Sequence, residues 1–330
     1  MEHQVYVFEV PTLYFCSHAL PHERLNCLII KTATTPAQQE TTIPALAWLL
    51  VIVLALIWGT SFILIKKGLV IYSSDEVGAL RMVIACAALL PFAFRNLRKV
   101  EPSRWKFLLG SGLLGNFFPA FLFAIAETRL ASGLAGVLNS LTALFTLLVG
   151  AALFGQSITW LRTLGIIIGI AGTAILIFTG NGNAELGNMY YGLYIVLATI
   201  FYGTSANIIK HRLHGMKAIA ISSLALLTVG PVALVYLLTT DFFYKLQHVP
   251  GAWEALMYIA ILAVFSTAIA LVLFNKLIHI STTLFASSTT YLIPVVALMW
   301  GVLDGETIHL WHYAGMAVIL AGVFIVNRAR

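Results

Sequence analysis

Hydrophobic residues along the chain gather in ten long windows, and charged or turn-forming residues separate these windows. A helix needs roughly 20 apolar residues to cross the hydrocarbon core of a membrane, which is about 30 Å thick. The pattern therefore predicts ten transmembrane helices, at residues 44–65, 75–94, 105–126, 134–154, 162–178, 189–210, 218–238, 253–275, 283–302 and 310–327. The connections are short, so we expect neighbouring helices to form antiparallel hairpins with no soluble domain between them.

Residues 1–43 do not follow this pattern. They are mixed in polarity, include Pro11, Pro21 and Pro36, and end in a polar tract over residues 32–42. The segment lacks the basic start and the long apolar core of a secretory signal peptide. We interpret it as a poorly ordered N-terminal extension, and a start codon assigned too far upstream would explain it equally well.

Composition places these helices in a membrane protein. Of the 330 residues, 60% are hydrophobic and 10% are charged, against roughly 45–50% and about 25% in soluble domains. A soluble fold cannot bury that much apolar surface. The three cysteines, Cys16, Cys27 and Cys86, form no CxxC motif and no paired spacing, so we expect no disulfide framework, no metal site and no cofactor.

The 19 Lys and Arg residues are distributed unevenly between the two sides of the predicted helices. With a cytoplasmic N-terminus, fourteen of them lie inside, Arg81 lies within a helix, and four lie outside, namely Lys66, Lys67, Arg129 and Lys245. Cytoplasmic loops of membrane proteins carry such an excess of Lys and Arg. The pattern predicts a multi-pass protein of the plasma (inner) membrane with both termini in the cytoplasm, and it indicates no nucleic-acid partner.

Two stretches of the first half of the chain recur in the second half. With a shift of 144 positions, the residues that recur are Gly59, Thr60, Ser61, Ile65, Lys66 and Leu69. With a shift of 150 positions, they are Leu153, Gly155, Ile158, Gly165, Ala171 and Gly172. Each repeat holds five helices, an odd number, so the second repeat must enter the membrane from the opposite side. The sequence predicts two inverted repeats, at residues 44–179 and 187–327, an arrangement typical of secondary transporters.

The residues in these repeats resemble a known family. The matching features are the run Trp58-Gly59-Thr60-Ser61-Phe62 with Lys66, Arg81 in the second helix, and the pairs Gly155-Gln156 and Gly305-Glu306 before glycine-rich helices. Over about residues 47–327 the chain resembles EamA-type members of the drug/metabolite transporter superfamily. The resemblance implies an all-α fold of ten helices, two inverted EamA repeats and a central cavity. The chain departs from the common pattern at Gln156, where an acidic residue is usual.

Arg81 is the only basic residue well inside a predicted helix. A charge at that depth is costly and needs a partner. The sequence allows two partners for Arg81. One is Glu127, at the outer end of the third helix, and the other is a negative group of the substrate, such as a carboxylate. Glu127 is also the one candidate for a proton site.

Aromatic and polar side chains recur on shared helix faces. Trp58 and Ser61 are three residues apart, as are Tyr202 and Ser205, so each pair lies on one face. The residues predicted to line a substrate cavity are Trp58, Thr60, Ser61, Arg81, Asn116, Asn139, Thr142, Tyr202, Ser205, Asn275, Ser287 and Tyr291. The alternative is that these side chains pack helices or join them by hydrogen bonds.

Glycines and prolines inside the predicted helices have more ordinary interpretations. Close helix packing is predicted at Gly165, Gly169, Gly172, Gly315 and Gly322. Pro119 and Pro294 remove backbone hydrogen bonds in the middle of their helices, which favours either a bend used in gating or a tolerated kink.

Function follows from the repeats and the candidate cavity. We predict a secondary transporter of small metabolites, amino-acid-like or other organic compounds, that exports them by alternating access. A non-transporting membrane receptor or assembly subunit with the same fold is the alternative. The sequence contains no HExxH motif, no nucleophile elbow and no phosphate-binding loop, so no catalytic residues are expected. The predicted partners are a small-molecule substrate and the lipid bilayer, and a homo-oligomer is compatible with the fold.

Overall fold

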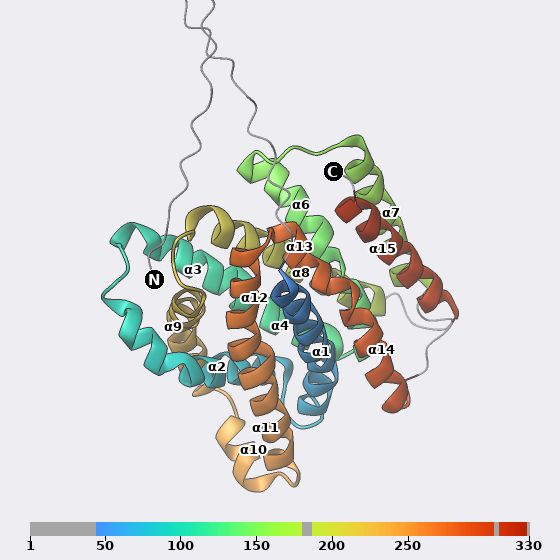
Figure 1. Ribbon diagram of the computed structural model, residues 1–330. Coiled ribbons are helices and arrows are strands. Elements are labelled where there is room, and N and C mark those ends of the chain that lie inside the picture. Colours follow the sequence, from blue (N-terminus) through green and yellow to red (C-terminus); the bar gives the residue numbers. More distant parts are fainter. Residues whose placement is uncertain (1–43, 180–186, 307–309, 329–330) are drawn as a thin grey trace, which may run out of the picture. The chain divides into compact units, whose positions relative to one another are not determined.

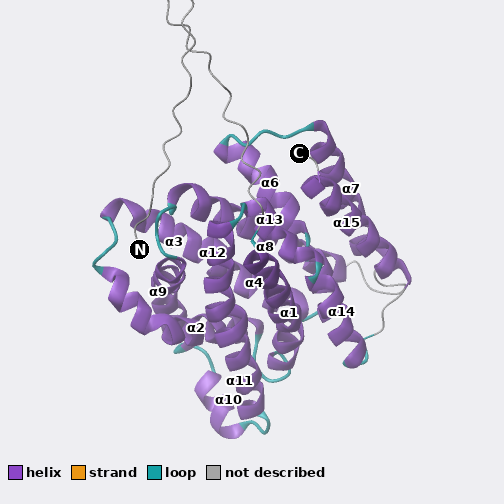
Figure 2. Cartoon of the chain, in the orientation of Figure 1, coloured by secondary structure: helices purple, strands orange, loops and turns teal. Residues whose placement is uncertain are grey.

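The computed structural model describes residues 44–179, 187–306 and 310–328. Within these ranges the chain is helical and holds no strand (Figure 2), as expected for an all-α membrane protein. The predicted N-terminal extension, residues 1–43, lies outside the described residues.

The first half of the chain forms seven α-helices and two short helices of other types. They are α1 (Ala45–Gly68), α2 (Ser74–Leu97), the 3-10 helix η1 (Pro102–Arg104), α3 (Trp105–Gly112), the π-helix η2 (Leu113–Phe117), α4 (Phe118–Glu127), α5 (Ser132–Leu138), α6 (Leu141–Phe154) and α7 (Trp160–Thr179).

The second half begins with α8 and contains a second π-helix. Its elements are α8 (Gly187–Arg212), α9 (Ala218–Leu237), α10 (Phe242–His248), α11 (Ala252–Ile261), the π-helix η3 (Leu262–Ile269), α12 (Ala270–Ile280), α13 (Thr283–Ser287), the 3-10 helix η4 (Ser288–Tyr291), α14 (Ile293–Leu303) and α15 (Leu310–Arg328).

Seven helical segments are long and apolar enough to cross a membrane. They are Ala45–Gly68, Ser74–Leu97, Pro102–Glu127, Ser132–Phe154, Tyr190–Arg212, Ala218–Leu237 and Ala252–Ile280. Three shorter apolar segments are Trp160–Ile175, Thr289–Leu303 and Tyr313–Val326. Each of these segments overlaps one of the ten apolar windows predicted from the sequence.

Local sequence explains several helix ends. Ser73 begins α2 with a capping box, because its side chain accepts the Glu76 N–H while the Glu76 carboxylate accepts the Ser73 N–H at 2.8 Å. At the other end of the fold, α6 stops at Gly155, whose φ of 67° is a left-handed conformation that favours glycine.

Four interruptions divide the longer helices at mid-length. The π-helix η2 separates α3 from α4, and the π-helix η3 separates α11 from α12. A short break at Asn139 and Ser140 separates α5 from α6, and η4 separates α13 from α14. Pro119 and Pro294 lie in the first turn after η2 and η4, where they have no N–H to donate to the preceding turn. π-Helices are often found at functional positions.

Helix α1 lies among the other helices and packs against α4, α5, α11, α12 and α14. Its residues Leu54, Ala55 and Ile65 are almost completely buried. Helix α8 similarly packs against α3, α4, α5, α6 and α12. The side chains of α1 and α8 at mid-length are therefore held at the centre of this fold.

Helices α7 and α15 pack side by side (Figure 1). Their backbones approach so closely that a Cβ atom on Gly172 would lie 2.7 Å from the Ile319 nitrogen. The five glycines predicted to pack helices all have backbone atoms at this contact, and they are Gly165, Gly169, Gly172, Gly315 and Gly322.

The substitution Gly322→Ala is expected to lower the free energy of unfolding by about 1–3 kcal/mol, because overpacking displaces backbone. The new Cβ would lie 2.5 Å from the Gly169 nitrogen and 2.6 Å from the Gly165 oxygen, and neither atom can move alone. Thermal unfolding of the purified protein in detergent measures the loss. Ala321→Val is the matched control, since Ala321 is the preceding residue and is exposed. Equal stability of both variants would show that the helices do not pack in this way.

Candidate functional site

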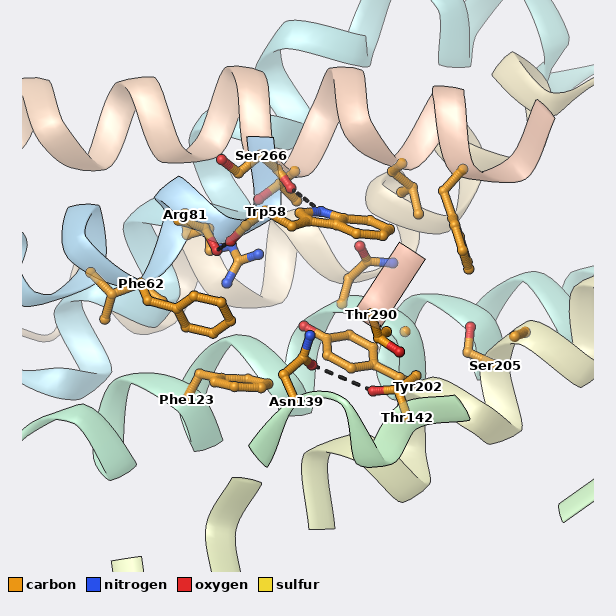
Figure 3. A pocket seen from close by; sticks show the side chains of 18 of the residues that line it. Trp58, Phe62, Arg81, Phe123, Asn139, Thr142, Tyr202, Ser205, Ser266 and Thr290 are labelled. Atoms are coloured by element: carbon orange, nitrogen blue, oxygen red, sulfur yellow. Dashed lines mark hydrogen bonds between the residues drawn. The ribbon is translucent and has the colours of Figure 1, made fainter. Parts of the chain in front are cut away.

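A cavity of about 100 Å³ lies between the helices at mid-length (Figure 3). Its walls come from α1, α2, η2, α4, α6, α8, η3, α12, η4 and the break between α5 and α6. Eight of the twelve predicted cavity residues line it: Trp58, Ser61, Arg81, Asn116, Asn139, Thr142, Tyr202 and Ser205. All four interruptions of the helices supply lining residues, so irregular backbone reaches the cavity from several sides.

Trp58 is fixed on the cavity wall by the second half of the chain. Its indole N–H donates to the Ser266 carbonyl at 2.9 Å, and the Ser266 hydroxyl donates to the Ile57 carbonyl at 3.2 Å. The ring also meets Phe274 edge to face, with 5.1 Å between the ring centroids. Trp58 therefore offers the cavity an aromatic surface whose polar atom is already hydrogen bonded.

Arg81 reaches the cavity from α2 and is buried apart from 8% of its surface. Its Nε–H donates to Thr267 Oγ1 in η3 at 2.7 Å. Figure 3 shows the guanidinium pointing toward the space between Trp58 and Tyr202. Arg81 is the one charged side chain among the described residues that line the cavity.

The expected ion pair between Arg81 and Glu127 is not formed among the described residues. Thr267, 186 positions away in the sequence, takes the Nε–H of Arg81 instead. Glu127 is buried at the end of α4, does not line the cavity, and neither of its carboxylate oxygens has a hydrogen-bond partner in the described part of the chain.

The opposite wall combines amides, hydroxyls and aromatic rings. Thr142 donates to Asn139 Oδ1 at 3.4 Å, and the Tyr202 ring stacks on Phe123 with 6.0 Å between centroids. Asn116, in η2, is 6% exposed, and its Nδ2 group has no acceptor among the described residues. Asn116 is therefore a lining residue whose hydrogen-bond donor no described side chain uses.

Three predicted residues do not line the cavity. Thr60 accepts the indole N–H of Trp300 at 2.9 Å, so it joins α1 to α14. Asn275 is completely buried and donates to Ser222 Oγ at 2.8 Å. The Tyr291 hydroxyl donates to the Val323 carbonyl. These side chains join helices, the alternative that the sequence left open, whereas the side chain of Ser287 lies outside the described residues.

Sequence reasoning did not select several lining residues, among them Phe62, Thr267, Phe274 and Thr290. Helical spacing gives no signal for Phe274, because eight residues turn an α-helix about 80° past Ser266 and part of that stretch is the π-helix η3. Thr290 lies in η4, where the helical spacing that guided the selection does not hold.

A cluster of charges joins three elements at the C-terminal end of α1. We call Lys66, Lys67, Ser132, Gly133, Asp304 and Glu306 the Glu306 cluster. Lys66 Nζ lies 2.8 Å from Glu306 Oε1 and 2.9 Å from Asp304 Oδ2, and Lys67 Nζ lies 2.6 Å from Asp304 Oδ1. The cluster ties α1 to the segment that follows α14.

Glu306 also holds the start of α5. It accepts the Ser132 N–H at 2.9 Å, the Ser132 hydroxyl at 2.8 Å and the Gly133 N–H at 3.1 Å. Burial alone would raise the pKa of this carboxyl, but the hydrogen bonds from Lys66, Gly133 and Ser132 outweigh burial and lower the pKa below its ordinary value. Glu306 is therefore ionised at neutral pH.

An all-helical fold with long apolar helices and a mid-length cavity of mixed polarity is typical of membrane proteins that transport small molecules. The EamA-like transporter family matches this chain twice, at residues 45–178 and 189–328. The chain belongs to this family, within the drug/metabolite transporter superfamily that its sequence resembles.

Relatives agree with this assignment. The "Uncharacterized inner membrane transporter YedA" of Escherichia coli (strain K12) is 29% identical over 83% of this chain and 88% of its own length. A "Probable amino-acid metabolite efflux pump" of Salmonella typhimurium is 26% identical over 84% of this chain and 93% of its own. A "Probable terminal-alkyne amino-acid exporter" of Streptantibioticus cattleyicolor is 24% identical, with shares of 85% and 93%.

The fold also matches a solved crystal structure. That structure is 17% identical in sequence and has a TM-score of 0.60. The match covers 84% of this chain and 95% of the other. This likeness supports the fold. The family match, the relatives and the apolar helices together describe a multi-pass inner membrane protein that transports a small molecule. The family and the names of its members point to a transporter and not to an enzyme.

Proposed function

We propose that this protein is a secondary transporter that exports small organic metabolites by alternating access. Its ten transmembrane helices form two inverted five-helix repeats, at residues 44–179 and 187–327, with both termini in the cytoplasm. Substrate binds in the central cavity between the repeats, and each repeat in turn opens the cavity to one side of the membrane.

One contact carries this proposal. The Ser140 hydroxyl donates to the Thr290 carbonyl at 2.9 Å, and these residues are 150 positions apart, which is the shift between the two repeats. Equivalent residues of two repeats meet where a twofold axis passes between them. Both lie in breaks of their helices, and Thr290 lines the cavity. This contact supports a twofold axis beside the cavity, which alternating access by inverted repeats requires.

The π-helices support the same symmetry. With a shift of 150, Asn116 in η2 corresponds to Ser266 in η3, and both residues line the cavity. The glycines with positive φ at the ends of α6 and α14, Gly155 and Gly305, correspond with the same shift. Irregular backbone at equivalent positions of two repeats is typical of a transporter binding site.

The proposed direction of transport and the proposed substrate class rest on the orientation of the protein in the membrane and on the names of its relatives. The excess of Lys and Arg in the loops that would face the cytoplasm supports two cytoplasmic termini. Relatives named "Probable amino-acid metabolite efflux pump" and "Probable terminal-alkyne amino-acid exporter" support export of similar compounds. The cavity volume of about 100 Å³ suits small molecules, since a cavity of roughly 150 Å³ holds benzene.

Flux into proteoliposomes tests the proposal. We expect the purified full-length protein to move at least one compound from a panel of radiolabelled amino acids, organic cations and carboxylates faster than protein-free vesicles do. In a variant with Cys16, Cys27 and Cys86 replaced by serine, Ser205→Cys places a thiol on the cavity wall. A bulky thiol reagent should then abolish this flux.

A matched control carries its cysteine on the same helix but away from the cavity. Leu193 is 50% exposed on α8, so the same reagent on Leu193→Cys should leave flux unchanged. Equal loss in both variants would place the transport path elsewhere. No flux for any compound would favour the receptor or assembly subunit.

A further inference from the structure

We infer that the cavity selects its substrate by a carboxylate group and does not require an ammonium group, so that its substrates are small monocarboxylates with an apolar carbon skeleton. This inference rests on the proposed function and narrows its substrate class.

The charge of the cavity is the first argument. Arg81 is the one charged lining residue in the described part of the chain, and its guanidinium forms no ion pair there. Glu127 is also buried, but it does not line the cavity. A buried positive charge that water screens poorly attracts an anion strongly and disfavours a cation. A carboxylate on the substrate would complete the pair that the described side chains leave open.

The geometry of the donors is the second argument. Thr267 takes the Nε–H of Arg81, which turns the guanidinium toward the space between Trp58 and Tyr202 (Figure 3). The planar ends of the guanidinium suit the two oxygens of a carboxylate. The buried Asn116 Nδ2 group adds a neutral N–H donor without an acceptor among the described residues. Both groups donate hydrogen bonds, and an anion accepts them.

The other described lining residues suit an apolar carbon skeleton. They provide no negatively charged group that could pair with an ammonium group. Trp58, Phe62, Phe123 and Phe274 line the cavity, and the indole N–H of Trp58 is already bonded to Ser266. Acceptors on the wall are neutral amide and hydroxyl oxygens, with no carboxylate among the described lining residues. An ammonium group would meet Arg81 without a counter-charge. It is therefore tolerated only on a molecule that also carries a carboxylate.

Three probes that share the same branched four-carbon unit test the inference. They are 3-methylbutanoate, which carries a carboxylate, valine, which carries both groups, and 2-methylpropylamine, which carries an amine alone. Binding to the full-length protein in lipid nanodiscs is measured by tryptophan fluorescence and by thermal stabilisation. We expect 3-methylbutanoate to bind at least as tightly as valine, and the amine to bind at least about 30-fold more weakly.

Variants assign the selectivity to Arg81. Arg81→Gln should weaken binding of 3-methylbutanoate by about 30-fold or more, and Arg81→Lys should restore part of it because the charge returns without the planar fork. Arg104→Gln is the control, since Arg104 is a half-buried cation that donates to the His214 carbonyl and does not line the cavity. If Arg81→Gln does not fold, the order of the three probes on the unmodified protein decides.

The outcomes separate the inference from the proposed function. Amine binding as tight as carboxylate binding, or no binding of any probe, overturns the substrate class. So does carboxylate binding that survives Arg81→Gln. The proposed function would still stand in each case if flux of another compound is blocked by the reagent on Ser205→Cys. Carboxylate binding that the same reagent leaves unchanged would instead place the site outside the cavity and overturn both.

Discussion

Replacing Glu306 by glutamine is expected to destabilise the protein by about 2–4 kcal/mol. Oε1 of Glu306 accepts from Lys66 and Ser132, and Oε2 accepts from Gly133. An amide in either orientation would turn an N–H group toward one of these donors. It would also leave Lys66 with Asp304 as its one ion-pair partner among the described residues. Thermal and denaturant unfolding of the purified protein measure the loss.

Two controls show whether the loss of stability depends on the position of Glu306 or only on the removal of a negative charge. Glu101→Gln removes a carboxylate whose side chain is 71% exposed and lies 3.5 Å from Arg104, so it should change stability by less than about 0.5 kcal/mol. Asp304→Asn removes ion pairs but no bond to α5, so its effect should be intermediate. A loss from Glu306→Gln no larger than that from Glu101→Gln would contradict the structural role of the Glu306 cluster.

The same carboxyl predicts a pH dependence. Its pKa in the folded protein lies below the ordinary value of 4.5, because the hydrogen bonds from Lys66, Gly133 and Ser132 exceed the opposing effect of burial. A carboxyl of this kind stabilises the protein above its unfolded pKa and loses that contribution as pH falls through its folded pKa. The stability difference between the unmodified protein and Glu306→Gln should narrow on acidification below about pH 4.5. A difference that widens in acid would rule this explanation out.

Hydrophobic windows predicted much of the helical architecture, because a membrane permits few alternatives to an apolar helix. Shared helix faces also placed Trp58, Ser61, Tyr202 and Ser205 on one cavity. Thr60 was included although it adjoins Ser61, and about 100° of rotation per residue turns it toward α14 instead. Helical geometry applied residue by residue would have excluded it.

Contacts between residues that are far apart in the sequence could not be predicted from it. Arg81 and Glu127 are the obvious buried pair by charge, but the guanidinium donates to Thr267, whose position depends on how η3 packs against α2. Lys66 and Glu306 are 240 positions apart, and nothing local links them. Pairing of this kind is decided by tertiary packing.

The interruptions of the helices were predictable only in part. Pro119 and Pro294 signalled distortion, and they follow η2 and η4 directly. The π-helix η3 and the break at Asn139 have no such proline beside them. In a long apolar stretch the helical hydrogen bonds can shift by one residue without changing hydrophobicity, so periodicity gives no sign of these features.

Different interactions join the helices at the two ends of the cavity. With a shift of 150, Gln156 corresponds to Glu306, but its amide donates to Asn207 Oδ1 at 3.1 Å and lies 3.1 Å from the His211 ring. Lys210, the counterpart of Lys66 with a shift of 144, donates to the carbonyls of Ile278 and Ser281. Ion pairs join one end, whereas hydrogen bonds without a carboxylate partner join the other among the described residues. In the proposed orientation the ionic end faces outward, so the resting protein should favour opening toward the cytoplasm.

Gln156→Glu is expected to change this balance. The carboxylate would lie beside His211 of α8, and a hydrogen bond to a charged group contributes about 1.5–3 kcal/mol. Closure of the cytoplasmic end should then become about 10- to 100-fold more favourable. With the Glu306 cluster intact both ends resist opening, so we expect flux in proteoliposomes to fall by a similar factor.

Moving the charge from one end to the other gives the sharper result. In the double variant Gln156→Glu with Glu306→Gln, the ionic link is transferred to the cytoplasmic end. A thiol at Ser205→Cys, on the cavity wall, should react with membrane-impermeant reagents mainly from the cytoplasmic side in the parent protein and mainly from the outside in the double variant. Gln156→Met matches the length without a charge and should leave the side preference unchanged. If Gln156→Met reverses the side preference as Gln156→Glu does, the loss of the amide controls opening and the added charge does not. The difference between the two ends would then have no electrostatic basis.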